Sequence, residues 1–178
     1  MKREEGRGKR EEQRKDNWDS ENTSPFPLPP FPFPAKKVFL AQTDTTVGFL
    51  SQSADTLIRI KTRPPHKQFL KVYADWKVFK ADGGRIPKAH RAYLRRAEKT
   101  TFVIKDDAYR VVNSGEHHEL LKSYGWLYST SANQSGKPYE RSFCEASADI
   151  IVEDFRGFSE SLPSSIELLG KIKRKKLR

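Results

Sequence analysis

The stretch Ser129-Thr130-Ser131-Ala132-Asn133-Gln134-Ser135-Gly136 directly follows a strand-like run, Gly125-Trp126-Leu127-Tyr128. It carries four hydroxyls, side-chain amides and a glycine within eight residues, so it cannot build a core. Short polar side chains and a glycine at the end of a strand suit a loop that folds around an anion or a nucleotide. Clusters of Ser, Asn and Gly are also common in plain turns. Taken alone, the stretch leaves both interpretations open.

The net charge of +11 is concentrated at the two ends of the 178-residue chain. Residues 1–37 hold nine basic and seven acidic side chains, and residues 171–178 hold six basic side chains and no acid. The remainder carries 19 basic and 16 acidic groups. The charge is therefore partly an effect of the ends, and it does not by itself indicate a nucleic-acid-binding protein.

Cysteine usage and hydropathy predict the compartment. The single cysteine, Cys144, excludes an internal disulfide and a cysteine-rich metal cluster, and it fits a reducing compartment. We expect it to be a buried structural thiol rather than a nucleophile. No apolar run approaches the roughly 20 residues needed to span a bilayer, and the N-terminus lacks the pattern of a signal peptide. The sequence therefore predicts a cytoplasmic protein without a membrane partner.

The sequence predicts two parts, a charged leader over residues 1–36 and a folded domain over residues 37–178. Residues 25–34 read P-F-P-L-P-P-F-P-F-P, and proline at nearly every second position favours polyproline II over a helix or a central strand. Disorder or a stiff leader is typical of such composition. Upstream sequence read through a misplaced start is an alternative for this segment.

The folded part alternates short β-like and helical segments, which predicts the α/β class. Strands are expected at residues 37–41, 100–105, 109–112, 126–128 and 148–152, the last of these being the final strand. Helices are expected at residues 55–60, 88–99 and 116–124, and residues 69–78 are expected to form a strand followed by part of a helix. A turn is expected at residues 105–107.

Three cations, Lys61, Arg63 and Lys67, stand close together around a proline pair, Pro64–Pro65. A residue before proline is pushed out of the helical region, and in an extended segment side chains at i and i+2 point the same way. Lys61 and Arg63 can then close on one polyphosphate, the lysine as a point charge and the arginine as a bidentate fork. A solvated basic edge is the alternative interpretation.

Two further features suit polar ligands. The Thr-rich residues 42–48 lie between an expected strand and an expected helix, where hydroxyls either contact a small ligand or cap the helix. Arg110 lies in an apolar β-like run, so we expect an anionic partner for it. That partner is either a ligand or one of Asp106, Asp107 and Glu116.

The sequence lacks the motifs of several catalytic classes. It contains neither G-x-x-x-x-G-K nor G-x-G-x-x-G, and it has no G-x-S-x-G elbow. His117 and His118 are adjacent and would face different ways on a helix, and no further ligands stand at the spacing of a zinc site. The sequence therefore favours positioning of anionic reactants over covalent catalysis or a resident metal.

The motifs occur in the order T-D-T-T-V-G, K-T-R-P, T-T-F-V-I, a β-borne arginine, S-T-S-A-N-Q-S-G and L-P-S-S-I. This ordered set, over about residues 38–178, resembles the YrdC-like family of threonylcarbamoyl-AMP synthases, in its short form without the extra C-terminal domain. The resemblance implies a twisted mixed sheet with flanking helices and a positively charged concave face. It also implies that L-threonine, bicarbonate and ATP are joined into threonylcarbamoyl-AMP with release of pyrophosphate. The product would feed the N6-threonylcarbamoyl modification of adenosine 37 in tRNA, with the tRNA-modification transferase machinery as the downstream partner.

The resemblance also implies roles for single residues. ATP, which would bring Mg²⁺ bound to its phosphates, would be bound by Lys61, Arg63, Lys67, Ser131, Asn133 and Arg174. L-Threonine would be bound by Thr45, Arg110, Ser129 and Ser164, with its carboxylate at Arg110. No residue is expected to act as a nucleophile or an acid–base catalyst, and the contribution of Lys61 and Arg63 would be electrostatic.

Two alternatives remain at the level of the sequence. A non-catalytic protein of the same fold that binds double-stranded RNA or tRNA is favoured by the net charge, by residues 171–178 and by the basic segment 85–99. Lysine and arginine contacts to phosphate would make such binding strongly salt-dependent. A carbamoyl-transfer role, as in the YrdC-like domain of hydrogenase maturation proteins, is the other alternative, although those chains are much larger.

Overall fold

The computed structural model describes residues 36–62, 64, 67–155, 157–160 and 162–178. All of them lie in the unit Pro32–Arg178 of the chain. The expected leader, apart from Lys36, lies outside the described residues, and the predicted division of the chain stays a prediction. Within the described part, no helix is long and apolar enough to cross a membrane.

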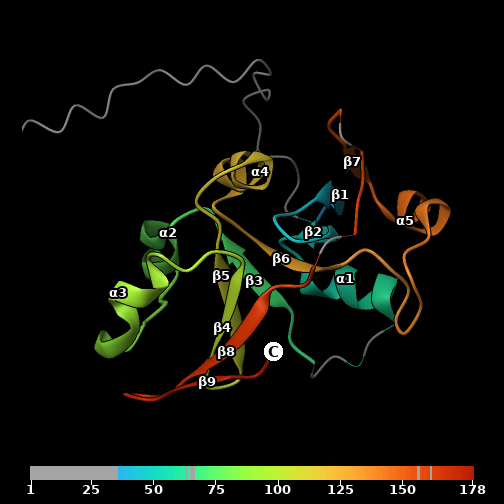
Figure 1. Cartoon of the computed structure of the whole chain (residues 1–178). Coiled ribbons are helices and arrows are strands. Elements are labelled where there is room, and N and C mark those ends of the chain that lie inside the picture. Colours follow the sequence, from blue (N-terminus) through green and yellow to red (C-terminus); the bar gives the residue numbers. More distant parts are fainter. Residues whose placement is uncertain (1–35, 63, 65–66, 156, 161) are drawn as a thin grey trace, which may run out of the picture. The chain divides into compact units, whose positions relative to one another are not determined.

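The elements alternate along the chain as the α/β prediction requires (Figure 1). The strands are β1 (Phe39–Gln42), β2 (Val47–Ser51), β3 (Leu70–Tyr73), β4 (Thr100–Ile104), β5 (Asp107–Val111), β6 (Trp126–Ser131), β7 (Ile150–Val152), β8 (Ser165–Leu169) and β9 (Arg174–Lys176). The helices are α1 (Ala54–Lys61), α2 (Trp76–Ala81), the 3-10 helix η1 (Lys88–His90), α3 (Arg91–Leu94), α4 (Glu116–Tyr124) and α5 (Arg141–Ser147).

The described strands form one sheet of order β7-β1-β2-β6-β3-β5-β4-β8-β9. The pairs β1–β7, β3–β5 and β4–β8 are parallel, and the other neighbouring pairs are antiparallel. The sheet is thus mixed, and helices pack on it. The predicted α/β class with a mixed sheet and flanking helices is confirmed.

Local sequence explains where several elements begin and end. The side chain of Ser53 accepts from the Thr56 N–H and caps α1, and α1 ends where Thr62 turns into the left-handed region with a φ of 45°. Asp75 caps α2 in the same way by accepting from two backbone N–H groups. Lys105, with a φ of 58°, makes the tight turn between β4 and β5, so the expected turn at 105–107 is confirmed.

Several predicted boundaries are wrong, because tertiary pairing overrides local preference. The Ser-rich stretch is strand as far as Ser131, since residues 128–131 pair with β2. The helix expected at 88–99 ends at Leu94, as η1 and α3. The strand at Ile150–Val152 is not the last one, because β8 and β9 follow and continue the sheet beyond β4. β2 was not expected at all.

The register assigns side chains to two faces of the central strands, because neighbouring residues of a strand point to opposite faces. Arg110 in β5 lies opposite Val72 in β3, and the face that they share is called the Arg110 face. Lys71, next to Val72, lies opposite Tyr109 in β5 and Tyr128 in β6, and this is the Lys71 face.

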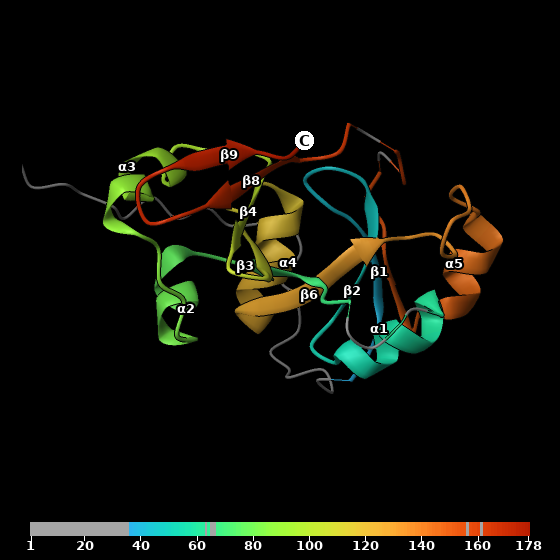
Figure 2. The same cartoon turned by 90° about the horizontal axis from the view of Figure 1, so that it is seen from below.

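Helices pack on both faces of the sheet (Figure 2) and bury apolar side chains against it. On the Arg110 face, α4 packs Leu120 and Leu121 into a core with the strands. On the Lys71 face, α1 and α5 bury Leu57 and Cys144 against β1 and β2, and α2 buries Phe79 against β3 and β4. Cys144 is fully buried, as expected of a structural thiol.

Candidate functional site

Arg110 is buried in β5, and its guanidinium is held from two sides. Its Nε and Nη2 donate to the hydroxyl of Thr101 in β4, at 3.2 and 2.9 Å. Its Nη1 donates to the Asp44 carboxylate at 2.9 Å and to the Thr45 hydroxyl at 3.2 Å. Thr101 and Arg110 share a face because their strands pair, whereas residues 44 and 45 come from the β1–β2 loop. The orientation of the guanidinium is therefore fixed.

The internal partner of Arg110 is Asp44, so the sequence prediction of Asp106, Asp107 or Glu116 is wrong. Asp107 instead accepts from the hydroxyl of Tyr109, at 3.2 Å and on the other face. A contact between residues 66 positions apart leaves no local pattern in the sequence.

His117, at the start of α4, contacts the same Asp44 oxygen, Oδ1, that accepts from Arg110. Its Nδ1 lies 3.1 Å from Asp44 Oδ1, and the histidine is buried. Burial raises the pKa of the Asp44 carboxyl, but the hydrogen bond to His117 and the charge of Arg110 outweigh it, and the pKa lies below its usual value. Asp44 is therefore a carboxylate at neutral pH, fixed between two side chains.

Ser164 joins the same group from the segment before β8. Its hydroxyl lies 3.0 Å from that of Thr101, and both side chains are buried. The Thr101 oxygen already accepts twice from Arg110, so its own proton is directed at Ser164. Ser164 can then donate its own proton to a ligand, while its backbone carbonyl accepts from the Arg178 side chain at 3.1 Å.

Lys61 builds a second polar group at the end of α1. Its side chain is buried, and its Nζ donates to the carbonyl oxygens of Ser131 and Asn133 and to the Asn133 side chain, at 3.0, 2.5 and 2.6 Å. The Ser131 hydroxyl also donates to the Asn133 side chain, at 2.7 Å. The lysine thus shapes the turn that follows β6, where the Ser-rich stretch leaves the sheet.

Ser129 lies in β6 between these two groups. It pairs with Leu50 of β2 and Leu70 of β3, on the Arg110 face. A Cβ added at Gly48 would lie 3.0 Å from the Thr130 carbonyl and 3.8 Å from the Ser129 hydroxyl. A side chain at position 48 would therefore crowd the Thr130 carbonyl, and glycine lets the β1–β2 hairpin lie close to β6 without that contact.

Of the other three expected site residues, Arg63, Lys67 and Arg174, the two that the structure describes belong to neither of these two groups. Arg63 is outside the described residues. Lys67 lies at a pocket on the Lys71 face. Arg174, in β9, lies over the Tyr93 ring with its guanidinium carbon 3.6 Å from the ring centroid, and it pairs with Glu167 at 3.6 Å. The structure thus groups Thr45, Arg110 and Ser164, and separately Lys61, Ser131 and Asn133.

Sequence reasoning missed four members of these groups: Asp44, Thr101, His117 and Arg178. Asp44 and Thr101 stand inside the quoted motifs T-D-T-T-V-G and T-T-F-V-I, so the motifs contained the signal. His117 was considered only as a metal ligand. Within the described part of the chain, no three His, Cys, Asp or Glu side chains cluster as a metal site.

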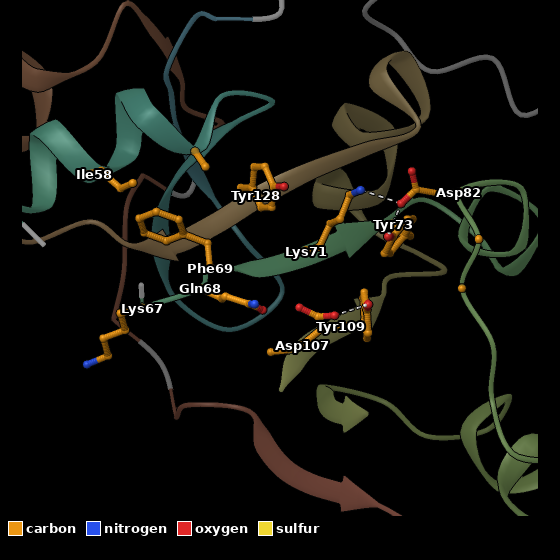
Figure 3. Close-up of a pocket in the computed structure, with 14 residues that line it drawn as sticks. Ile58, Lys67, Gln68, Phe69, Lys71, Tyr73, Asp82, Asp107, Tyr109 and Tyr128 are labelled. Atoms are coloured by element: carbon orange, nitrogen blue, oxygen red, sulfur yellow. Dashed lines mark hydrogen bonds and ion pairs between the residues drawn. The ribbon is translucent and has the colours of Figure 1, made fainter. Parts of the chain in front are cut away.

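The surface of the described residues has hollows on both faces of the sheet, and one hollow borders the group around Arg110. One, of about 440 Å³, lies on the Lys71 face between α1 and the residues that follow α2 (Figure 3). The other, of about 350 Å³, borders Asp44 and is lined by Arg95, Arg96, Lys99 and polar residues of the loop after β5. Glu98 also lines this hollow, so its lining carries both signs of charge.

Sequence comparison gives one relative of limited extent. No family model matches the chain. Over 100 residues, 54% of the chain, it is 34% identical to the uncharacterized protein MG259 homolog of Mycoplasma pneumoniae. The chain spans about a fifth of that relative, since the matched part is 21% of its length.

Solved structures share the fold at low sequence identity. P. abyssi Sua5, in a crystal structure complexed with L-threonine, matches 80% of the chain and 50% of its own length, with a TM-score of 0.66 and 18% identity. E. coli YciO matches 80% and 82%, with a TM-score of 0.61 and 16% identity. HypF, in its phosphate- and nucleotide-bound form, matches 80% and 26%, with a TM-score of 0.61 and 13% identity. The chain has the fold of the Sua5 and YrdC proteins, so the resemblance read from the sequence is confirmed at the level of the fold.

Proposed function

We propose that this chain is an L-threonylcarbamoyl-AMP synthase that joins L-threonine, bicarbonate and ATP and releases pyrophosphate. The observation that carries the proposal is the meeting of Thr45, Arg110 and Ser164 in one buried hydrogen-bonded group. These residues come from three distant motifs of the sequence. The fold on which they meet is shared with a protein whose structure holds L-threonine.

The buried group offers the donors that an amino acid needs. The carboxylate of threonine would lie at Arg110, and the Ser164 hydroxyl would donate to it because Thr101 already supplies the proton that Ser164 accepts. Arg110 is held rigidly by Thr101 and Asp44, so it would lose little freedom when the ligand binds. Ser129, on the same face of the sheet, would complete the site on the side of the nucleotide.

The phosphates of ATP would approach the turn after β6. Lys61 places a positive charge directly beneath this turn, and Ser131 and Asn133 supply polar side chains there. Arg63 and Lys67 follow in the same segment of the sequence and would add charge from the solvent side. Mg²⁺ would arrive with the phosphates of ATP, and we assign no residue to hold it.

The reaction needs positioning rather than a protein nucleophile. Bicarbonate and the threonine amine combine with loss of water to give a carbamate, and a carbamate oxygen then attacks the α-phosphorus of ATP. The new oxygen–phosphorus bond forms as the bond to the bridging oxygen breaks, and pyrophosphate leaves. Both reactants are anionic, so fixed cations and oriented donors would supply most of the acceleration.

Pyrophosphate release, measured with ATP and bicarbonate in the presence and absence of L-threonine, tests this proposal. We expect release to require threonine. Lys61→Ala should lower the rate by about 100-fold, the loss typical when one preorganised electrostatic group is removed, while Lys122→Ala, on an exposed face of α4, should leave it unchanged. Release that ignores threonine would contradict the proposal.

RNA binding is a second candidate, and one contact favours it. The stacking of Arg174 on Tyr93 brings the basic α3 segment and the basic β9 strand together. The cations of the two segments are Lys88, Arg91, Arg95, Arg96, Lys171, Lys173, Arg174, Lys175, Lys176 and Arg178. A tRNA titration at several salt concentrations tests it, since phosphate contacts produce a steep loss of affinity with salt. Tight, salt-dependent binding together with no ATP affinity would favour this function over the synthase.

A further inference from the structure

The helix α4 holds His117 against the Asp44 carboxylate. It is anchored near its start by His118, whose Nδ1 lies 2.8 Å from the Val112 carbonyl oxygen, and farther along by leucines packed in the core of the Arg110 face. The His117 side chain is only 3% exposed. It therefore meets the carboxylate away from water, where a hydrogen bond to a charged group is strong.

The proton on the His117 ring decides what its Nδ1 atom can do. This nitrogen lies 3.1 Å from Asp44 Oδ1, and the backbone N–H of Asp44 points at it from 3.3 Å. Without a proton, Nδ1 would turn its lone pair toward an ionised carboxylate oxygen. With a proton, it donates to that oxygen. A charge-assisted hydrogen bond is stronger than a neutral one, so the form with a proton on Nδ1 is favoured.

The other ring nitrogen of His117 contributes no hydrogen bond to the fold. Nε2 is buried and has no hydrogen-bond partner among the described residues. A buried polar atom without a partner lowers stability, and such atoms are rare in native proteins. An apolar side chain would fill this space without that loss. The contact of Nδ1 with Asp44, rather than packing, therefore explains why a histidine lies here.

The same contact acts on Arg110 through Asp44. The Asp44 Oδ1 atom that His117 contacts also accepts from Arg110 Nη1, at 2.9 Å. A guanidinium has five N–H groups, and four of them are engaged here, two with Thr101, one with Asp44 and one with Thr45. One N–H of Nη2 has no partner among the described residues. Because the guanidinium is planar, the hold of Asp44 on Nη1 also sets the direction of this remaining N–H.

We infer that His117 is a positioning residue of the amino-acid site: it holds Asp44, and Asp44 aims the remaining N–H of Arg110 at the substrate carboxylate. The identity of that substrate rests on the proposed function, in which it is L-threonine. His117 itself touches no substrate in this arrangement. Its loss should weaken the binding of threonine and leave ATP binding unchanged, because the turn held by Lys61 makes no contact with α4.

Paired variants of His117 test the inference in the pyrophosphate-release assay. The amide nitrogen of asparagine lies near the position of Nδ1, so His117→Asn can still donate to Asp44. Glutamine places its amide near the position of Nε2, so His117→Gln loses the contact. We expect the KM for threonine to rise by about 10-fold in His117→Gln, at the low end of the loss when a hydrogen bond to a charged group is removed directly. In His117→Asn it should stay close to that of the parent protein, and in both variants the KM for ATP and kcat should change little.

His118→Gln is the matched control, because His118 is adjacent on α4 and contacts the Val112 carbonyl rather than Asp44. This change can destabilise the helix, but it should not alter the KM for threonine. A KM for threonine that rises equally in His117→Asn and His117→Gln, or that rises as much in His118→Gln, would overturn the inference. An unchanged KM in all three variants would also reject it.

Side-chain NMR tests the same contact without relying on substrate. Nitrogen-15 spectra of the parent protein should show a proton on His117 Nδ1 and slowly exchanging Arg110 N–H signals. The Arg110 signals should broaden in His117→Gln and stay sharp in His118→Gln. A proton on Nε2 alone, or Arg110 signals that ignore His117→Gln, would contradict the inference. Arg110 signals that depend on His117, without threonine-dependent pyrophosphate release, would support the positioning role and reject the proposed function.

Discussion

Two cation–carboxylate pairs lie on opposite faces of the same sheet and differ in what surrounds them. Arg110 and Asp44 keep 7% and 15% of their side chains exposed, and hydroxyls and His117 take further bonds around them. Lys71 and Asp82 keep 17% and 31% exposed, beside a pocket walled by aromatic rings. A cation–carboxylate pair thus fixes the Arg110 side chain within a buried polar group on one face. On the other face, such a pair neutralises the charge of Lys71 at the wall of an open pocket.

The pKa values of the Asp44 and Asp82 carboxyl groups are both lowered, but different neighbours lower them. The pKa of each is raised by burial, and in each this effect is outweighed by hydrogen bonds and by the charge of the cation. For Asp44, the histidine contributes more than the arginine, whereas for Asp82 the hydrogen bond from Lys71 leads, followed by that from Tyr73. Both are ionised at neutral pH, so burial and not charge separates the two pairs.

The largest expected effect is on stability, when the carboxylate is removed on each face. Asp44→Ala leaves a buried guanidinium without its counter-ion, which should cost about 3–5 kcal/mol of unfolding free energy. Asp82→Ala leaves Lys71 able to reach water, so the loss should be about 1 kcal/mol or less. Urea unfolding of the two variants measures the contrast, and equal losses would show that the faces do not differ.

The sequence motifs predicted the fold, but they did not predict which side chains contact one another in the site. The T-D-T-T-V-G and S-T-S-A-N-Q-S-G segments carry residues that meet substrates in the proposed function, and their order along the chain resembles one family. The pairing of Arg110 with Asp44 depends on the β1–β2 loop, 66 positions away in the sequence, and nothing within a few residues of either position signals it. The nearby Asp106, Asp107 and Glu116 were the expected partners for that reason.

Strand register explains the other omissions. Tyr109 and Arg110 are neighbours in the sequence, yet they lie on opposite faces and serve different groups. The aromatic pocket draws Phe69 and Tyr73 from the β3 segment, Tyr109 from β5 and Tyr128 from β6, and none of these segments has a motif of its own. β9 was missed because a short, charged strand such as Arg174–Lys176 has no β-like pattern until it pairs with a neighbour.

Acidification should sharpen the contrast between the faces. The lowered pKa of Asp44 means that its contribution to stability is present above the ordinary carboxyl pKa and is lost as the pH falls through the lowered value. The destabilisation caused by Asp44→Asn should therefore be full at pH 6 and shrink toward pH 2. Urea unfolding of both proteins across this range measures the effect, and a gap that stays constant with pH would remove the carboxylate as its cause.

The smallest expected effect comes from the cation of the Lys71 pair. Lys71→Met removes a partly exposed ion pair, worth about 0.2–1 kcal/mol, and a contact with the Trp126 ring, worth about 0.5–1 kcal/mol. The methionine can still pack on that ring, so the net loss should stay within about 1 kcal/mol. Arg110→Met is the matched change on the other face and should cost about 3 kcal/mol or more, because it leaves Asp44 buried without its cation. A loss of that size for Lys71→Met would show that the Lys71 pair contributes as much to stability as the Arg110 pair, and the difference in burial would then not explain the behaviour of the two faces.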